Sequence, residues 1–318
     1  MFSRDPVKED QLVARPRQPA ADFAVYLVVR FAVCILQALT LDTGRVLAEA
    51  LAWLAYRVDR RHREVALDNL RQAFPGQFSE EQLHRHVRDV YRHFARIVIE
   101  MVHLPRKLHP CNWRRYIDLP QGREIVDALL ADRPVLLVTG HYGNWEMAGY
   151  ALAMFGFKSW AIARPLDNPY LDRFVRTFRE KTGQKLIAKK GEFDLIEGVL
   201  KSKGILCTLG DQDAGQRGLF VDFFGRPAST HKAIALLALE HRTQLVVAAA
   251  RKVGEPMRYV VEVAAALAPD QVEQFSVRGL TQHFTSALET LVRRDPWQYF
   301  WLHRRWKHQP MKKARQAA

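Results

Sequence analysis

The stretch that decides the fold reads Pro134-Val135-Leu136-Leu137-Val138-Thr139-Gly140-His141-Tyr142-Gly143-Asn144-Trp145-Glu146. Its first half is a short, apolar, partly β-branched run that predicts a buried strand. The apolar and small residues that follow, 147–154, predict a helix. The polar hexapeptide 141–146 therefore lies at a strand-to-helix corner, which is where an open α/β sheet places its binding site.

His141 and Glu146 lie five residues apart, so on one regular helix their side chains would point about 140° away from each other. If His141 lies in the loop and Glu146 in the first helical turn, the carboxylate can turn back to the imidazole. Gly143 permits the unusual backbone angle that this needs, and Asn144 can cap the helix. The carboxylate would then hold one tautomer while the other ring nitrogen takes a proton from a hydroxyl. We predict a catalytic pair; a helix start with a salt-bridged histidine is the alternative.

The composition indicates a globular protein. Its 318 residues, 48% hydrophobic and 26% charged, suffice for one large α/β domain with an appended segment. The formal charge of +14 indicates a polyanionic partner, and nucleic acid, an anionic bilayer and a phosphorylated lipid all fit that charge. Cys34, Cys111 and Cys207 are scattered and odd in number. This argues against a disulfide framework or a zinc site and favours a reducing compartment.

The first third of the chain divides into three parts. Residues 1–20 mix charges with prolines and predict a mobile cytosolic tail. Residues 21–56 contain an apolar run as long as the ~20 residues that span a bilayer. Arg30 interrupts this run, and an arginine at the centre of a bilayer costs roughly 2.5–3.5 kcal/mol. We expect a membrane-associated segment with an obliquely embedded or interfacial helix whose Arg30 reaches lipid phosphates. Buried core helices are the alternative. Residues 57–112 predict a further helical region.

Residues 113–318 alternate between strand and helix patterns. Expected strands lie at 134–139, 160–163, 185–188, 204–209, 244–250 and 259–263, and expected helices at 122–131, 147–154, 170–182, 193–203, 233–240 and 271–293. This alternation predicts an α/β domain with a mixed, mostly parallel sheet flanked by helices. The last two strands are expected to form a hairpin.

Polar residues follow two of these strands. Arg164 is placed to bind a phosphate or carboxylate, or to pair with Asp167 in its own loop. Asp211 and its neighbour Gln212 follow another strand. Because no further acidic ligands accompany Asp211, we expect it to orient a substrate hydroxyl or to hold the loop rather than to bind a metal.

Two aromatic stretches remain. Phe223 and Phe224 lie in a phenylalanine-rich loop and either wall an apolar groove or cover the core. Arg226 beside them would meet an anionic group. The basic C-terminal stretch 296–307 interleaves aromatics with cations. This pattern either stacks on single-stranded nucleic acid or places indoles and arginines at lipid head groups.

The string His141-Tyr142-Gly143-Asn144-Trp145-Glu146 resembles the H-x-x-x-x-(D/E) motif of glycerolipid acyltransferases, in the form found in the lipid A biosynthesis (lauroyl/myristoyl) acyltransferases. Blocks similar to that family's follow in its order: Asn69-Leu70 with Ala73-Phe74-Pro75, Arg164-Pro165 with Asn168-Pro169, Gly210-Asp211-Gln212, and Phe223-Phe224-Gly225. The resemblance covers roughly residues 44–307 and implies catalytic roles for His141 and Glu146. The substrate-binding residues that it implies are Gly143, Asn144, Trp145, Arg164, Asn168, Asp211, Gln212, Phe223, Phe224, Gly225 and Arg226.

The resemblance implies a membrane-bound acyltransferase. It would move a fatty acyl chain from acyl carrier protein or acyl-CoA to a hydroxyl of a lipid A precursor or related glycolipid, without a metal or cofactor because the thioester is already activated. We expect it at the inner membrane, with the catalytic domain on the cytoplasmic face and no nucleic-acid partner. An acyltransferase for phosphatidylinositol mannosides or a lysophospholipid is the nearest alternative. A basic nucleic-acid-binding protein is the alternative from another class, and a hydrolase is disfavoured because the sequence lacks G-x-S-x-G.

Overall fold

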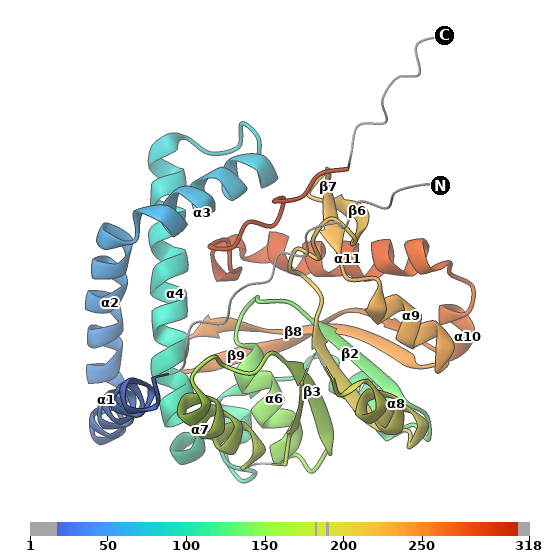
Figure 1. The fold of residues 1–318 in the computed structure, drawn as a ribbon, viewed down its shortest axis with the longest axis horizontal. Helices are drawn as coiled ribbons and strands as arrows, with labels where there is room; N and C mark the ends of the chain where they lie inside the picture. Colours follow the sequence, from blue (N-terminus) through green and yellow to red (C-terminus); the bar gives the residue numbers. More distant parts are fainter. Residues whose placement is uncertain (1–17, 182, 189–190, 311–318) are drawn as a thin grey trace, which may run out of the picture.

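The computed structural model describes residues 18–310 apart from 182, 189 and 190. Nearly all of the tail expected at 1–20 therefore lies outside the described residues. Figure 1 shows a helical layer, in blue and cyan, beside a body in which helices cover a central sheet. The expected class, a mixed and mostly parallel sheet flanked by helices with a helical N-terminal segment, is confirmed.

Four helices precede the sheet. They are α1 (Pro19–Ala38), α2 (Leu41–Val58), α3 (Arg60–Ala73) and α4 (Glu80–Lys107). Helix α4 begins after Ser79, whose hydroxyl accepts from the amide of Gln82 while the Gln82 side chain accepts from the Ser79 amide. Helix α2 packs along α4, where Glu49 accepts from Arg92 at 2.6 Å and from Arg96 at 2.8 Å. These ion pairs join the two helices into one layer.

Helix α1 lies on the outside of this layer and has no buried residue. Within the described residues it is the one helix long and apolar enough to cross a bilayer, with a mean hydropathy of 1.8. The guanidinium of Arg30 lies 4.9 Å from the ring centroid of Phe174 in α7 (Pro169–Glu180). The alternative of a buried core helix is therefore wrong for α1, and its contact with a membrane stays a prediction.

The central sheet has the strand order β1-β9-β8-β2-β5-β3-β4. Its strands are β1 (Ile117–Asp118), β2 (Val135–Thr139), β3 (Ser159–Ala163), β4 (Lys185–Ala188), β5 (Ile205–Leu209), β8 (Gln244–Gly254) and β9 (Arg258–Leu267). Strand β2 lies between β5 and β8 and runs parallel to both, whereas β8 and β9 form the expected antiparallel hairpin. The carboxyl ends of β2 and β5 therefore meet at one edge, although about 70 residues separate their following loops.

Helices cover both faces of this sheet. The remaining ones are α5 (Gly122–Leu130), α6 (Trp145–Met154), α8 (Phe193–Lys201), α9 (Ala233–Glu240), α10 (Pro269–Val272) and α11 (Val277–Arg294). Successive side chains of β2 face opposite sides, so Leu136 and Val138 pack with α8, α9 and α11, whereas Val135 packs with α5. The single helix expected at 271–293 is two helices, α10 and α11.

The phenylalanine-rich loop is a hairpin of two strands, β6 (Leu219–Phe223) and β7 (Arg226–Thr230), which the sequence did not predict. Phe224 and Gly225 form its turn with φ values of 56° and 72°, and positive φ at both positions matches the twist of a hairpin. Phe223 is 1% and Phe224 5% exposed, and they pack against indoles of the C-terminal segment. They cover the core, which is the second of the two interpretations offered for them.

The C-terminal segment 296–307 packs back into the core. Trp301 is 0% and Arg305 1% exposed. Arg305 donates to the carbonyl of Ser229 at 2.6 Å and to the hydroxyl of Thr230 at 2.7 Å, which supplies the partners that a buried charge requires. For Trp301 and Arg305 both interpretations offered above are wrong, because these two side chains are buried and lie neither at lipid head groups nor on a surface that nucleic acid could reach.

Candidate active site

The corner between β2 and α6 is held by β8 and by the C-terminal segment. Gly143 has φ +61°, and a Cβ there would overlap the carbonyl oxygen of Ala250, so only glycine fits. The amide of Gly143 donates to the carbonyl of Gln298 at 3.1 Å, and that of Asn144 to the carbonyl of Ala250 at 2.8 Å. The Asn144 side chain caps α6 as expected, accepting from the amide of Met147 at 2.9 Å. The backbone of the corner is therefore fixed before any substrate binds.

Buried side chains of α4 and β9 support the same corner. Burial lowers the pKa of His93 to about 3, so its ring is neutral, and Nε2 donates to the carbonyl of Gly143 at 3.2 Å. The side-chain Nδ2 of Asn144 donates to the hydroxyl of Tyr259 at 3.0 Å, and that hydroxyl donates to Glu100. No local sequence pattern predicts these supports, because they come from elements about 50 and more than 100 residues away from the corner.

His141 is hydrogen-bonded to Asp211, which lies just past the end of the neighbouring strand β5. Asp211 Oδ1 accepts from His141 Nδ1 at 2.9 Å, and Oδ2 accepts from the His141 amide at 2.8 Å. Asp211 is 2% exposed. Burial alone would raise its pKa, but the charge of His141 and the hydrogen bonds from it hold the pKa of Asp211 well below its usual value. The carboxylate is therefore ionised and fixes the tautomer of the imidazole.

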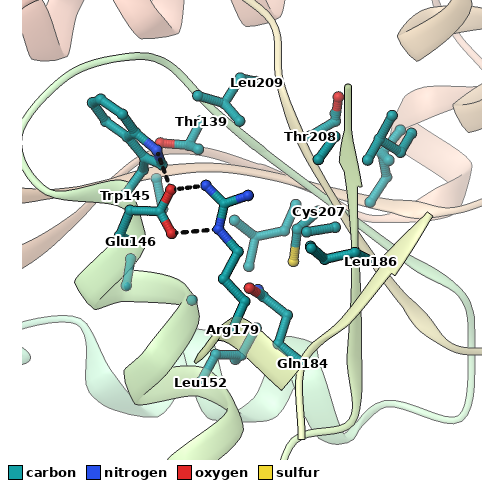
Figure 2. A pocket seen from close by; sticks show the side chains of 18 of the residues that line it. Thr139, Trp145, Glu146, Leu152, Arg179, Gln184, Leu186, Cys207, Thr208 and Leu209 are labelled. Atoms are coloured by element: carbon teal, nitrogen blue, oxygen red, sulfur yellow. Dashed lines mark hydrogen bonds and ion pairs between the residues drawn. The ribbon is translucent and has the colours of Figure 1, made fainter. Parts of the chain in front are cut away.

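Glu146 has different partners from those that we expected. Its carboxylate accepts from the indole Nε1 of Trp145 at 3.1 Å and from Nε of Arg179 at 2.8 Å, with a second contact to the same guanidinium. Figure 2 shows this pair, with Arg179 reaching from α7 to Glu146 at the start of α6. The expected direct pair of His141 with Glu146 is corrected to a pair of His141 with Asp211. The cause is strand order, which brings Asp211 to the imidazole while α6 turns Glu146 towards α7.

The charges around His141 favour its protonated form. Burial by itself lowers its pKa, but the charge and hydrogen bond of Asp211 and the charge of Glu146 raise it, and the net pKa of His141 lies above its ordinary value. With Nδ1 donating to Asp211, the neutral ring carries its lone pair on Nε2. The amide nitrogen of Gln212 lies 3.4 Å from this atom. His141 is thus arranged to accept a proton at Nε2.

A large apolar pocket has His141 in its lining and takes its other lining residues mainly from the sheet and from the helices α5 to α9. Its volume is about 1020 Å³, at the upper end of the ~300–1,000 Å³ usual for ligand pockets. His141, Trp145, Glu146, Arg164 and Gln212 are among the residues that line it. The pocket is otherwise mainly apolar, and six of its lining residues are Leu129, Leu137, Leu152, Phe157, Leu186 and Cys207. This shape fits a long apolar chain whose reactive end lies beside the imidazole.

Four of the other predicted site residues lie outside the pocket lining. Asn144 is fully buried at the corner. Asn168 caps α7 by accepting from the amides of Tyr170 and Leu171 and donates to the carbonyl of Asp22 in α1 at 2.8 Å. Gly225 forms the hairpin turn, and Arg226 is exposed at the start of β7. None of the four is among the described residues that line the pocket.

Arg164 fits both interpretations offered for it. It lines the pocket, and it also pairs with Asp167 at 3.0 Å, with 79% of its side chain exposed. An exposed pair of this kind is weak, so the guanidinium can exchange Asp167 for an anionic group. Among the described residues, no group of three or more His, Cys, Asp or Glu side chains could hold a metal ion.

The fold and this site define a class: an α/β protein with a His-Asp pair at the mouth of a deep apolar pocket. The family model described as bacterial lipid A biosynthesis acyltransferase matches residues 16–308, and the chain belongs to this family.

Named relatives agree with that assignment. The lipid A biosynthesis palmitoleoyltransferase of Escherichia coli (strain K12) is 24% identical over 255 residues, which are 79% of this chain and 81% of that protein. The phosphatidylinositol mannoside acyltransferase of Mycobacterium tuberculosis (strain ATCC 25618 / H37Rv) is 28% identical over 152 residues, or 46% of this chain and 48% of that protein. A protein of the same description from Mycolicibacterium smegmatis is 29% identical over 146 residues. The chain spans about half the length of these mycobacterial relatives.

Proposed function

We propose that this protein is an acyltransferase that moves a fatty acyl chain from a thioester to a hydroxyl of a glycolipid. The observation that carries the proposal is the position of His141, whose Nδ1 is held by Asp211 and whose ring lines the apolar pocket. A fatty chain in this pocket would bring its thioester carbonyl to the imidazole, which is the geometry that general-base catalysis requires. The family match supports the same class of reaction.

The proposed reaction needs one proton acceptor and no covalent acyl-enzyme. Nε2 of His141 takes the proton of the acceptor hydroxyl as its oxygen attacks the thioester carbon, and Asp211 stabilises the imidazolium. Collapse of the tetrahedral intermediate breaks the carbon–sulfur bond, and the leaving thiolate takes the proton back from His141. The amides of His141, Gly143 and Asn144 are already engaged. We assign the oxyanion to Arg164, which lines the pocket and whose side chain is 79% exposed.

The identities of the acyl donor and of the acceptor have less support than the class of reaction. Either acyl carrier protein or acyl-CoA supplies the thioester. The family description and the E. coli relative favour a lipid A precursor as acceptor, and the mycobacterial relatives make a phosphatidylinositol mannoside the second candidate. The exposed apolar helix α1 supports attachment to the inner membrane, and the three free cysteines support a catalytic domain on the reducing, cytoplasmic side.

Substitutions in the pair test the proposal. Transfer from acyl carrier protein or acyl-CoA thioesters to lipid A precursor and to phosphatidylinositol mannoside would be measured for the wild type, His141→Ala and Asp211→Asn. We expect His141→Ala to lower kcat by about 10²–10⁴ and Asp211→Asn to approach the ~10⁴-fold loss known for the aspartate of such a triad. Glu146→Gln should cost less than Asp211→Asn, because Glu146 acts on His141 through charge alone. Wild-type turnover in Asp211→Asn would exclude the His-Asp assignment.

The pH profile supplies a second readout. A general base works in its neutral form, so kcat/KM rises as the pH passes through the pKa of His141. Asp211 raises that pKa, and Asp211→Asn removes the charge, so the acid limb of the profile should move to lower pH while the plateau falls. An unchanged limb in Asp211→Asn would mean that His141 is not the group that titrates.

A further inference from the structure

One wall of the apolar pocket carries a polar side chain. Gln184, immediately before β4, is 8% exposed and lines the pocket. Figure 2 shows its amide among the side chains of Leu152, Leu186 and Cys207. Within residues 18–310 and outside the three gaps, this amide makes no hydrogen bond to another protein group. The amide is open to the pocket, where water can bind it. Covering it with an apolar group would leave it unpaired, at a cost of about 1–3 kcal/mol.

The helix opposite is built to admit this amide. A Cβ on Gly149 of α6 would lie 2.7 Å from Nε2 and 3.1 Å from Oε1 of Gln184. Glycine in the middle of a helix costs roughly 0.5–1 kcal/mol relative to alanine. The chain therefore carries a weaker helix residue at the point where the amide approaches α6, and an alanine at 149 would displace the amide.

The position of the amide indicates which part of a bound chain it meets. Gln184 precedes β4, at the end of the sheet opposite His141, because β4, β3, β5 and β2 all run in one direction. Its side chain reaches Gly149, which lies four residues past Trp145 in α6 and so about 6 Å along that helix. A fatty chain with its carbonyl at His141 would pass the amide with its middle carbons, beyond the thioester.

We propose that Gln184 is a specificity-determining residue that selects acyl chains carrying a hydroxyl group along the chain. The proposal rests on the proposed function, because it takes the pocket as the site of the acyl chain. An unsubstituted chain would displace the water at Gln184 and leave the amide unpaired, whereas a hydroxyl group replaces that water. Sites built to hydrogen-bond a substrate hydroxyl discriminate strongly against the analogue that lacks it.

Competition between donors tests this selection. Thioesters of one chain length would be offered in pairs to the full-length protein in detergent: saturated against hydroxylated, with the hydroxyl moved along the chain, and saturated against monounsaturated. We expect the wild type to prefer one hydroxylated donor over the saturated one by about ten- to hundredfold in kcat/KM. Gln184→Leu should bring this ratio close to one by improving use of the saturated donor.

Two further variants separate the amide from the shape of the pocket. Gly149→Ala keeps the amide but displaces it, and should also lower the ratio. Leu186→Met changes the pocket wall at nearly constant volume and should leave the ratio unchanged; Gln184→Met serves if Gln184→Leu does not fold. An unchanged ratio in the Gln184 variants, or a change confined to the monounsaturated donor, would overturn the proposal.

A binding experiment keeps this inference separate from the proposed function. Saturated and hydroxylated free fatty acids of one length would compete with a fluorescent fatty acid for the pocket of the wild type and of Gln184→Leu. Absence of transfer from every donor would overturn the acyltransferase proposal alone. Equal affinity of the wild type for the two fatty acids would overturn the role of Gln184 even if transfer occurs.

Discussion

The two ends of the described chain both combine apolar side chains with arginine, yet their surroundings are opposite. Helix α1 (Pro19–Ala38) has no buried residue, and Phe31 on it is 69% exposed. In the segment 296–307, Tyr299, Trp301 and Arg305 are each at most 1% exposed. The segment 296–307, whose mixture of aromatic and basic residues is typical of a binding surface, is thus part of the core.

The difference lies in the partners that each arginine finds. Arg305 donates to Ser229 and Thr230 and lies 5.2 Å from the ring centroid of Phe223, so β6 and β7 provide its acceptors and its packing. Arg30 has the ring of Phe174 on one side and remains exposed. A sequence that interleaves aromatic and basic residues therefore predicts a contact surface. It does not predict whether that surface contacts lipid, nucleic acid or the rest of the protein.

The buried end also belongs to the site. The amide of Phe300 donates to the carbonyl of His141 at 2.9 Å, and the carbonyl of Gln298 accepts from Gly143 at 3.1 Å. The C-terminal segment thus pairs with both sides of the catalytic corner, like a short extra strand. Loss of this segment should therefore affect turnover as well as stability, whereas changes in α1 should affect neither in detergent.

The largest contrast is expected between two tryptophans. Trp301→Ala removes a fully buried indole that contacts Phe74, Phe224 and Tyr299, and should lower the free energy of unfolding by about 3–5 kcal/mol. Trp53→Ala, in α2, removes a side chain that is 59% exposed and should change it by less than about 0.5 kcal/mol. Urea unfolding in detergent measures both. Similar losses in the two variants would contradict the contrast between the buried C-terminal segment and the exposed side of the N-terminal helical layer.

A smaller effect is expected at Asn69, which ties the C-terminal segment to α3. Its buried amide donates to the carbonyls of Trp301 and His303, both at 2.7 Å. Asn69→Leu leaves these two acceptors without their donor, at a cost of about 1–3 kcal/mol for each that stays buried. Asp68→Ala, on the exposed side of the same helix, is the matched control.

Hydrogen exchange shows whether this variant releases the corner. The amides of Gly143 and Phe300 join the corner to the segment, so both should exchange faster in Asn69→Leu, while amides in the centre of β2 keep their protection. Transfer activity should fall with them. Uniformly faster exchange across the sheet would mean that Asn69 supports the whole fold and has no particular link to the corner.

Local patterns were enough to predict most of the α/β body. The strands β2 to β5 and the helices between them are continuous apolar or amphipathic runs, and each can be recognised without knowing its neighbours. The hairpin β6–β7 was missed because Phe224 occupies its turn at φ 56°. Glycine, asparagine and aspartate are the residues that usually indicate a positive φ, and phenylalanine is not one of them. The break between α10 and α11 was missed because one amphipathic pattern continues through it.

The sequence was enough to predict which residues belong to the candidate site, but not which carboxylate pairs with His141. His141 and Asp211 were both placed at strand ends, but strand order is a property of the folded sheet, and only the neighbouring positions of β2 and β5 bring the two side chains within 2.9 Å. Glu146 was the nearer carboxylate in sequence. Its partner Arg179 comes from α7, and no spacing in the sequence links the two.

The smallest effect on the protein itself is expected at the exposed end. Phe31→Ser removes an apolar ring from the outer face of α1 and should leave the free energy of unfolding in detergent unchanged to within about 0.5 kcal/mol. If α1 lies in a bilayer interface, loss of one partly buried ring should weaken partition into anionic phospholipid vesicles by roughly tenfold. Leu236→Ser, on α9 at the opposite side of the molecule from α1 (Figure 1), is 43% exposed and provides the control. Flotation of the purified protein with vesicles measures the partition. Equal partition of the wild type and Phe31→Ser would mean that Phe31 of α1 does not contact the lipid. The two ends of the chain would then differ only in that α1 is exposed to water and the segment 296–307 is buried.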